Sequence, residues 1–254
     1  MARTFLTEQQ AQDFEANGYL VLRNCFNPQE VKDLVAWTDE VQNFPETPGK
    51  HMMYFENSLL DSDQRLLQRL ENFYPYHEGF HQLFEGERLL GVVSDLFNEP
   101  AVLFKDKINF KMPGGDGFKW HQDQQAGWGD YTDLFITALV SIDEVTKQNG
   151  PLEIAGGYHK EGLIGQEWVP LSEEHDSRMK FETFTLKPGD MAFFDSYAPH
   201  GSGPNLTDSP RRVLHVTYNK KSAGDFREQY YIDKRKSFPP DCEREPGKDY
   251  KFRV

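Results

Sequence analysis

The sequence predicts a single α+β domain, residues 1–254, whose core is an antiparallel β-structure. Helical spacing and capping signals dominate residues 1–100, whereas residues 101–220 form short apolar segments separated by Gly and Pro, a pattern typical of a sandwich or barrel. The chain of 254 residues contains 20 Phe, 11 Tyr and 4 Trp, enough large side chains for one well-packed core. Residues 221–254 add a polar helix and a tail.

The N-terminal part carries two helix-start signals. Thr7 is placed to cap a helix that ends at Gly18, a residue suited to the left-handed position after a helix. Asn27–Pro28 offers a second N-cap, followed by proline at the first helical position. The elements expected here are helices over 7–18, 28–41, 65–73 and 88–97 and a strand over 19–26.

The β-rich part is punctuated by turns. Lys187–Pro188–Gly189–Asp190 has proline and glycine where a type II turn requires them. Asn149–Gly150 is a second turn signal. Strands are expected over 101–111, 118–124, 134–144, 152–155, 181–186, 190–195 and 211–219, followed by a helix over 225–237.

Charge and composition exclude several classes of protein. The net charge of −13, without a concentrated basic patch, disfavours nucleic-acid binding. The longest mostly apolar run, residues 134–140, falls far short of the roughly 20 residues that span a bilayer. Cys25 and Cys242 offer no disulfide framework, and no signal peptide is evident. We therefore expect a cytoplasmic protein that binds a small molecule; the oligomeric state stays open.

The residues that indicate chemistry are His121, Asp123 and His200. His121 and Asp123 lie two apart on an expected strand and so point to one face. His200 directly follows a buried strand in a Gly-rich setting and can supply a third ligand. Two His and one carboxylate are the ligand set of non-haem Fe(II) oxygenases, which keep positions open for co-substrate and dioxygen.

A His-x-Asp pair alone is weak evidence, because it can also be a structural pair. The segment His159–Lys160–Glu161 has the same shape but follows Gly156–Gly157, and we interpret it as a solvated loop pair. The strand context and the second histidine distinguish His121 from this alternative.

Several separated motifs together resemble a known family. They are residues 14–23, 121–123, 149–152 leading to 156–159, 186–190, and 200–205 through 210–212. In these motifs the chain resembles the phytanoyl-CoA dioxygenase-like (PhyH) family of Fe(II)- and 2-oxoglutarate-dependent oxygenases. The resemblance covers most of the chain and implies a double-stranded β-helix, a cupin-like jelly roll, with the N-terminal helices packed on its major sheet.

The resemblance also implies roles for individual residues. Iron would be held by His121, Asp123 and His200, and an Arg on the strand after His200 would pair with the distal carboxylate of 2-oxoglutarate. The family spacing points to Arg211; because neighbours on a strand face opposite ways, Arg212 would then be a surface or interface charge.

The implied reaction is the decarboxylation of 2-oxoglutarate to succinate with O2, coupled to hydroxylation of an unactivated C–H bond, with ascorbate as an in vitro reductant. The acidic ligand Asp123 favours hydroxylation over halogenation, because halogenating relatives carry a small residue there.

One face of the expected strand 101–111 suggests an anionic ligand. Lys105, Lys107, Asn109 and Lys111 alternate with apolar residues. If this face lines the barrel, it offers cations to an anion, and Lys107 and Asn109 can also serve 2-oxoglutarate; the alternative is a solvated face.

Substrate contacts are expected from residues after the iron-binding strand, Gln124 and Trp128, and from a lid over residues 51–77 that includes Tyr54 and Glu56. Aromatic faces with carboxylates suit an ammonium group, although core packing is the alternative for each aromatic residue. Together these features suggest a small zwitterion, and the chain is similar to family members that hydroxylate 2-aminoethylphosphonate.

Three other functions stay open from the sequence. They are a hydroxylase of an acyl-CoA or secondary metabolite, a metal-dependent enzyme without 2-oxoglutarate, and a non-catalytic cupin-like module that binds a metal or small molecule. The complete ligand set together with Arg211 argues against the last.

Overall fold

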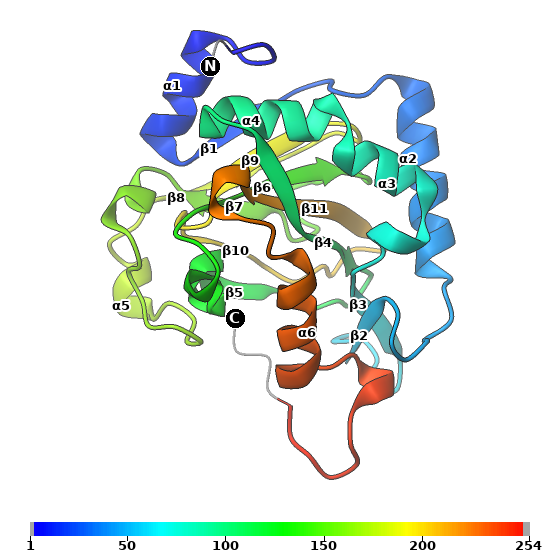
Figure 1. The fold of residues 1–254 in the computed structure, drawn as a ribbon. Coiled ribbons are helices and arrows are strands. Elements are labelled where there is room, and N and C mark those ends of the chain that lie inside the picture. The colour runs from blue at the N-terminus through cyan, green and yellow to red at the C-terminus, as the bar shows by residue number, and fades with distance from the viewer. Residues whose placement is uncertain (1–2, 251–254) are drawn as a thin grey trace.

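Two antiparallel sheets face each other in the computed structural model, which describes residues 3–250 (Figure 1). The larger has the order β1-β9-β6-β11-β4-β3-β2 and the smaller β5-β10-β7-β8. This is the predicted α+β architecture with a jelly-roll core. The strands are β1 (Tyr19–Leu22), β2 (Met52–Asn57), β3 (Arg65–Glu71), β4 (Ala101–Lys111), β5 (Phe118–His121), β6 (Phe135–Ser141), β7 (Leu152–Ala155), β8 (Phe181–Phe184), β9 (Met191–Asp195), β10 (His200–Ser202) and β11 (Arg211–Lys220).

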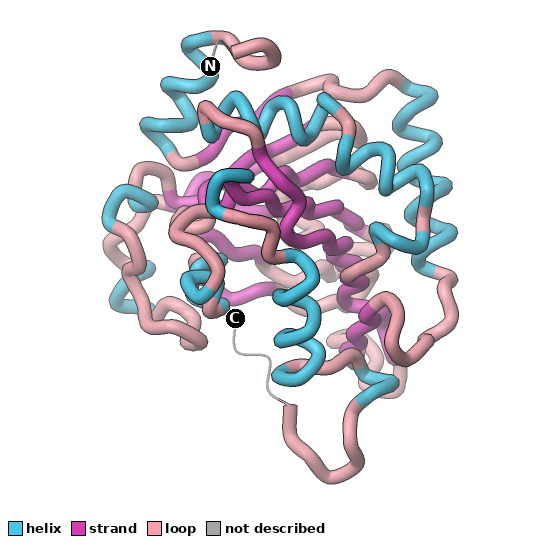
Figure 2. The backbone as a smooth tube through the Cα atoms, in the orientation of Figure 1, coloured by secondary structure: helices cyan, strands magenta, loops and turns pink. Residues whose placement is uncertain are grey.

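Helices cover the outer face of the larger sheet (Figure 2). An extensive apolar cluster joins them to the sheet, with Phe80 and Val93 from helices meeting Ile108 and Leu214 from strands. Burial of this cluster is the main force that holds the helical layer in place. The helices of this layer are α1 (Glu8–Asn17), α2 (Pro28–Gln42), α3 (Glu78–Glu85) and α4 (Val92–Phe97). Two further helices, α5 (Glu173–Asp176) and α6 (Arg227–Ser237), lie outside it.

The two predicted helix starts are confirmed. The Thr7 side chain accepts a hydrogen bond from the Gln10 amide, and Gly18 follows α1 with a φ of 77°. The Asn27 side chain accepts hydrogen bonds from two backbone amides of the first turn of α2. Each cap satisfies donors that the helix itself cannot pair.

The helix predicted over residues 65–73 is wrong, because this segment forms β3. β3 pairs with β2 in a hairpin and with β4, where Arg69 lies opposite Asn109. Its Arg, Leu and Gln residues are good helix formers, but intrinsic propensity is a weak determinant, and pairing with β4 overrides it. The sequence analysis also missed α3, a short helix that buries Phe80 and Phe84.

The inner faces of the two sheets differ along their length. At one part of the interface Leu139, Phe194 and Val213 of the larger sheet pack against Leu152 and Ile154 of the smaller. Elsewhere the inward side chains of the larger sheet are polar and line a cavity of about 1020 Å³. The candidate site lies in this cavity.

The C-terminal helix α6 closes one side of the cavity and is fixed by a buried carboxylate on β4. Arg227 lies 2.6 Å from an Asp106 oxygen, and the Tyr231 hydroxyl donates to the Asp106 backbone carbonyl at 3.0 Å. Aromatic side chains complete the contact, among them Phe104, Trp128 and Tyr230. Because Asp106 is fully buried, this anchoring is protected from water.

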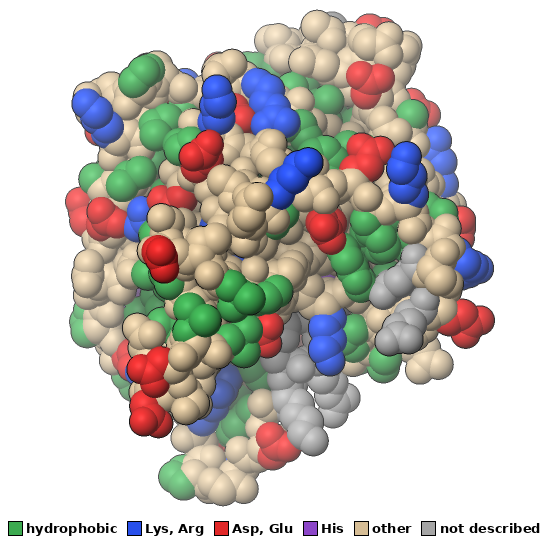
Figure 3. All heavy atoms as spheres, turned by 180° about the vertical axis from the view of Figure 1, so that it is seen from behind, with side chains coloured by type: hydrophobic (Ala, Val, Ile, Leu, Met, Phe, Trp, Pro, Cys, Tyr) green, Lys and Arg blue, Asp and Glu red, His purple; other side chains and the backbone are tan. Residues whose placement is uncertain are grey.

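Surface charge is mixed on the face opposite that of Figure 1, where Lys and Arg side chains lie among Asp and Glu (Figure 3). Within residues 3–250, the helices are too short or too polar to cross a membrane.

Candidate metal centre and its cavity

His121, Asp123 and His200, hereafter the triad, converge between the two sheets. Their candidate ligand atoms all lie within 4.8 Å of one another. The Asp123 Oδ1 atom is 3.8 Å from Nε2 of His121 and 3.9 Å from Nε2 of His200. His121 on β5 lies opposite His200 on β10, so the pairing of these two strands brings the imidazoles together.

Backbone carbonyls orient both imidazole rings. Nδ1 of His121 lies 2.6 Å from the Lys119 carbonyl, and Nδ1 of His200 lies 3.0 Å from the Ala198 carbonyl. A carbonyl only accepts, so each Nδ1 carries the proton and donates it. Each Nε2 therefore presents its lone pair to the shared space, as a metal-binding histidine requires.

Electrostatics favour the protonation states that a metal needs. Burial lowers the pKa of His121 to about 3 and also lowers the pKa of His200, so both imidazoles are neutral at neutral pH. Burial alone would raise the pKa of Asp123, but nearby positive groups, with Lys107 among them, hold that pKa below its ordinary value. Two neutral imidazoles and an ionised carboxylate are a complete donor set for a divalent ion.

The strand prediction for Asp123 is wrong in detail, although the residue reaches the expected place. β5 ends at His121, and Asp123 begins a short helical turn. Between them, the buried Gln122 side chain donates to the carbonyls of Gly162 and Tyr197, each at 2.7 Å. These bonds fix the exit of the strand, so the turn and not strand periodicity aims Asp123 at the histidines.

The two adjacent arginines of β11 face opposite ways. Arg211 is buried, lines the cavity, and donates to the Gly150 carbonyl, while its Nε has no partner. Arg212 points outward and makes a two-bond contact with Asp143, at 2.8 and 2.9 Å, and an ion pair with Asp39. The orientation expected for Arg211 is therefore present, and Arg212 serves packing between α2 and the sheet.

The polar face of β4 does line the cavity. Lys105, Lys107 and Asn109 are all lining residues, and Lys111 donates to Ser202 Oγ at 2.7 Å. Burial, with Lys105 as a like-charged neighbour, lowers the pKa of Lys107 to about 8. The alternative of a solvated face is thus wrong for this strand.

Asn109 and His215 form a polar pair in which each side chain has one polar atom without a hydrogen-bond partner. Asn109 Nδ2 lies 3.3 Å from His215 Nε2, while Asn109 Oδ1 and His215 Nδ1 are buried without partners. Such orphaned polar atoms are uncommon in native proteins and suggest a bound molecule. His215 was not predicted from the sequence. It lies four residues after Arg211 on the same strand, and because alternate side chains share a face, the sequence could have placed it on the same side as Arg211.

Of the four predicted substrate residues, one lines the cavity and three do not. Trp128 lines the cavity, but Tyr54, Glu56 and Gln124 are not among its lining residues. The Tyr54 ring packs against the Arg69 guanidinium, and its hydroxyl donates to the Phe238 carbonyl. Glu56 accepts a hydrogen bond from the side-chain amide of Gln68. The expected lid over these residues is instead strand β2 at the edge of the larger sheet, so its side chains pack locally.

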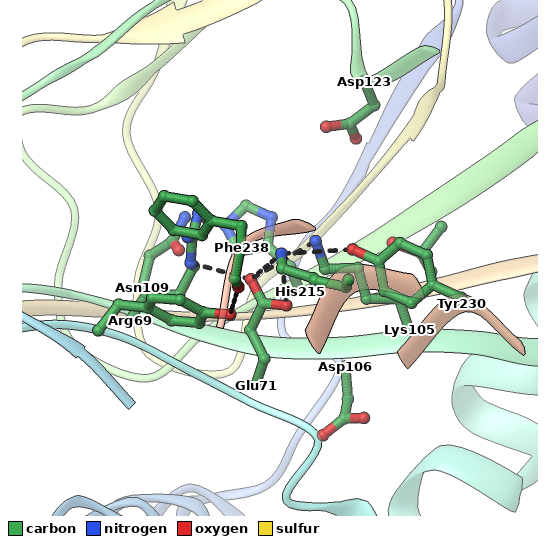
Figure 4. A network of polar contacts seen from close by, with 12 residues as sticks. Arg69, Glu71, Lys105, Asp106, Asn109, Asp123, His215, Tyr230 and Phe238 are labelled. Carbon is green, nitrogen blue, oxygen red and sulfur yellow. Dashed lines mark hydrogen bonds and ion pairs between the residues drawn. The ribbon is translucent and has the colours of Figure 1, made fainter. Parts of the chain in front are cut away.

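A cluster of cations surrounds one buried carboxylate beside the triad (Figure 4). Glu71 is fully buried and lies 2.9 Å from Arg69, 3.5 Å from Lys105 and 2.8 Å from Lys234. Sequence analysis named Lys105 but missed the others, because Arg69 and Glu71 fell in a segment interpreted as a helix and Lys234 lies in the polar C-terminal helix.

The rival pair at His159 is not part of the site. Its ring contacts the Glu15 carbonyl at 3.2 Å, next to the end of α1. His159 is half-buried in a short 3-10 helix, so the expectation of a solvated loop is wrong for this histidine.

Comparison with known proteins agrees with this geometry. The family model described as Phytanoyl-CoA dioxygenase (PhyH) matches residues 14–213. The chain is 41% identical over 248 residues to a 2-aminoethylphosphonate dioxygenase from uncultured bacterium HF130_AEPn_1, covering 97% of this chain and 94% of that protein. It is 36% identical over 236 residues to a methylphosphonate hydroxylase from Gimesia maris, covering 92% and 89%.

Among solved structures, EctD from S. alaskensis with 2-oxoglutarate and 5-hydroxyectoine superposes with a TM-score of 0.76 at 23% identity, covering 88% of this chain and 79% of that one. This likeness shows the fold, a jelly roll.

Proposed function

The chain belongs to the phytanoyl-CoA dioxygenase (PhyH) family and is an Fe(II)- and 2-oxoglutarate-dependent oxygenase, and we propose that it hydroxylates a small organophosphonate, with 2-aminoethylphosphonate the leading candidate. The observation that carries the substrate proposal is the 41% identity along nearly the whole chain to a relative of that name. The cation-rich cavity beside the triad supports it, because a phosphonate is an anion.

The triad would hold the iron. Its donors fit, since both Nε2 lone pairs and the Asp123 carboxylate face one shared space. Iron bound there would couple the oxidative decarboxylation of 2-oxoglutarate to the transfer of one oxygen atom into a C–H bond. The buried position of the triad limits access of water, which protects this chemistry from side reactions.

Arg211 would bind the distal carboxylate of 2-oxoglutarate. Its guanidinium is buried in the cavity wall and has a donor without a partner. A planar guanidinium matches a carboxylate with two parallel hydrogen bonds. Asn109 and His215, which line the same cavity, offer further free polar atoms to the same co-substrate.

The opening of the cavity suits an ammonium group. The exposed Asp130 and the half-exposed Asp233 both line it, and the Tyr131 hydroxyl donates to Asp233 at 3.1 Å. Carboxylates beside an aromatic ring attract a cation. These residues replace Tyr54 and Glu56 in the role expected for the positive end of the substrate.

Methylphosphonate is the second candidate substrate, favoured by the 36% identical relative that bears its name. It carries the phosphonate but lacks the amine. Comparing the binding of the two compounds therefore measures how much the ammonium group contributes to affinity.

Substrate-stimulated succinate release tests the proposal. The protein is incubated with Fe(II), 2-oxoglutarate, ascorbate and oxygen, together with 2-aminoethylphosphonate, methylphosphonate, a betaine, an amino acid or an acyl-CoA. We expect stimulation by the phosphonates. Stimulation by the acyl-CoA alone would contradict the substrate proposal, and no consumption of 2-oxoglutarate with any compound would favour a different metal-dependent activity or a binding module.

A further inference from the structure

Four cationic side chains gather in one part of the cavity wall. Arg69, Lys105, Lys107 and Lys234 line it, and Glu71 is the carboxylate in contact with three of them. Lys105 and Arg69 are buried, and the Lys234 side chain is only 10% exposed. Burying several like charges close together is costly, so a wall of this kind favours an anionic ligand.

The electrostatic consequences appear on the residues of the cluster. Burial, followed by Lys105 and Arg69 as like-charged neighbours, holds the pKa of Lys234 well below its ordinary value despite Glu71. The cations conversely hold the pKa of Glu71 low although its burial would raise it. Glu71 is thus ionised, and an anion bound beside Lys234 would oppose the burial and the like-charged neighbours that lower the pKa of this lysine.

2-Oxoglutarate bound by Arg211 would lie away from Lys105 along the sheet. Arg211 lies opposite Lys111 in the pairing of β11 with β4, and Lys105 is six residues further along β4. Six residues of a strand span roughly 20 Å. A small diacid held at Arg211 therefore lies nearer to Asn109 than to Lys105.

We infer that Arg69, Lys105, Lys107 and Lys234 form the subsite that binds the phosphonate group of the substrate, an inference that rests on the proposed function. The four cations come from three elements, with Arg69 on β3, the two lysines on β4, and Lys234 on α6. Asp106 lies on the other side of β4 (Figure 4) and anchors α6, which places Lys234 over the cavity.

The composition of the subsite selects a compact dianion. Lysine ammonium groups are point charges that suit a tetrahedral group with several oxygens, and here three lysines meet one arginine. Aromatic rings bound the subsite, since Lys105 Nζ lies 5.5 Å from the Trp128 ring and 5.3 Å from the Tyr230 ring. A monocarboxylate would leave more of the positive charge unpaired.

The test measures anion binding separately from turnover. Lys105→Met and Lys234→Met are titrated anaerobically, as Fe(II)- and 2-oxoglutarate-loaded protein, with 2-aminoethylphosphonate and with methylphosphonate by calorimetry. Methylphosphonate is also tested for thermal protection of the metal-free protein. We expect each variant to lose phosphonate affinity by roughly thirtyfold or more, while 2-oxoglutarate binding is retained. Lys221→Met, an exposed lysine just before α6, is the matched control and should behave as wild type.

Further variants guard against loss of folding. Lys105→Arg and Lys234→Arg keep the charge and should retain most of the affinity. Glu71→Gln keeps all four cations and should bind methylphosphonate at least as tightly as wild type.

Two outcomes overturn the inference and are distinguishable. Wild-type phosphonate affinity in both Met variants, with phosphonate turnover intact, would remove the cations from the substrate site but leave the proposed function standing. Absence of phosphonate binding and turnover in the wild-type protein itself would refute the proposed function and the subsite together.

Discussion

Replacing Arg211 by Met should impair 2-oxoglutarate binding, whereas the same change at Arg212 should impair stability. Both residues are buried, with 4% and 8% of their surface exposed, so burial does not distinguish them. Their orientation does, since Arg211 lines the cavity and Arg212 contacts Asp143 and Asp39 on the outer face.

The expected magnitudes follow from these contacts. A charge pair about 4 Å apart at an effective dielectric constant near 20 is worth about 4 kcal/mol. Truncating one partner of such a buried pair costs roughly 2–5 kcal/mol, which raises the dissociation constant for 2-oxoglutarate roughly thirtyfold to a few thousandfold. Arg212→Met instead loses hydrogen bonds between charged groups, which should lower the free energy of unfolding by about 1.5–3 kcal/mol.

Anaerobic titration of the Fe(II)-loaded proteins with 2-oxoglutarate gives the first quantity, and denaturant unfolding gives the second. Arg211→Lys should recover part of the affinity, because it keeps the charge but not the two-bond geometry. Weak 2-oxoglutarate binding in Arg212→Met together with normal binding in Arg211→Met would refute the reasoning.

Three further predictions address the metal, the pH dependence and the cavity wall. Alanine at any residue of the triad should weaken Fe(II) binding in an anaerobic titration and abolish turnover; full occupancy with normal activity would exclude that residue as a ligand. Burial raises the pKa of Asp195 to about 6, so the folded protein binds a proton that the unfolded chain has already released, and the free energy of unfolding falls as pH rises from about 4 to about 6. Asp195→Asn should remove that fall and be more stable by on the order of 2–3 kcal/mol above pH 6; parallel pH profiles of the two proteins would count against this. Gln125 donates to the carbonyls of Gln166 and Val169, so Gln125→Leu should speed amide hydrogen exchange in residues 162–170, whereas unchanged exchange would show that other contacts hold the loop.

The parts of the fold with local signals could be predicted from the sequence. Thr7 and Asn27 carry their caps within three residues, and the type II turn before β9 has its glycine at a φ of 85°. Residues 65–71 have no comparable signal. Their strand depends on pairing with β4, which lies more than thirty positions later, so local preference indicated the wrong element.

In the candidate site, too, the residues with local sequence signals were predictable and those placed by tertiary contacts were not. The triad and Arg211 were recognisable from their motifs and from the spacing of the family that the chain resembles. The cations around Glu71 were not, because β3 and α6 reach them only through tertiary contacts, and the role of Lys234 depends on how Asp106 anchors its helix. Tyr54 and Glu56 were misplaced for the related reason that a strand at a sheet edge replaced the expected lid.

The most direct test of the central claim is the fate of isotopically labelled dioxygen when the Fe(II)-loaded protein turns over 2-oxoglutarate and 2-aminoethylphosphonate. We predict one labelled oxygen atom in succinate and one in a hydroxylated product that retains its carbon–phosphorus bond, with succinate and product formed in equal amounts. Succinate formed at the same rate without the phosphonate, or a product without the label, would contradict the account.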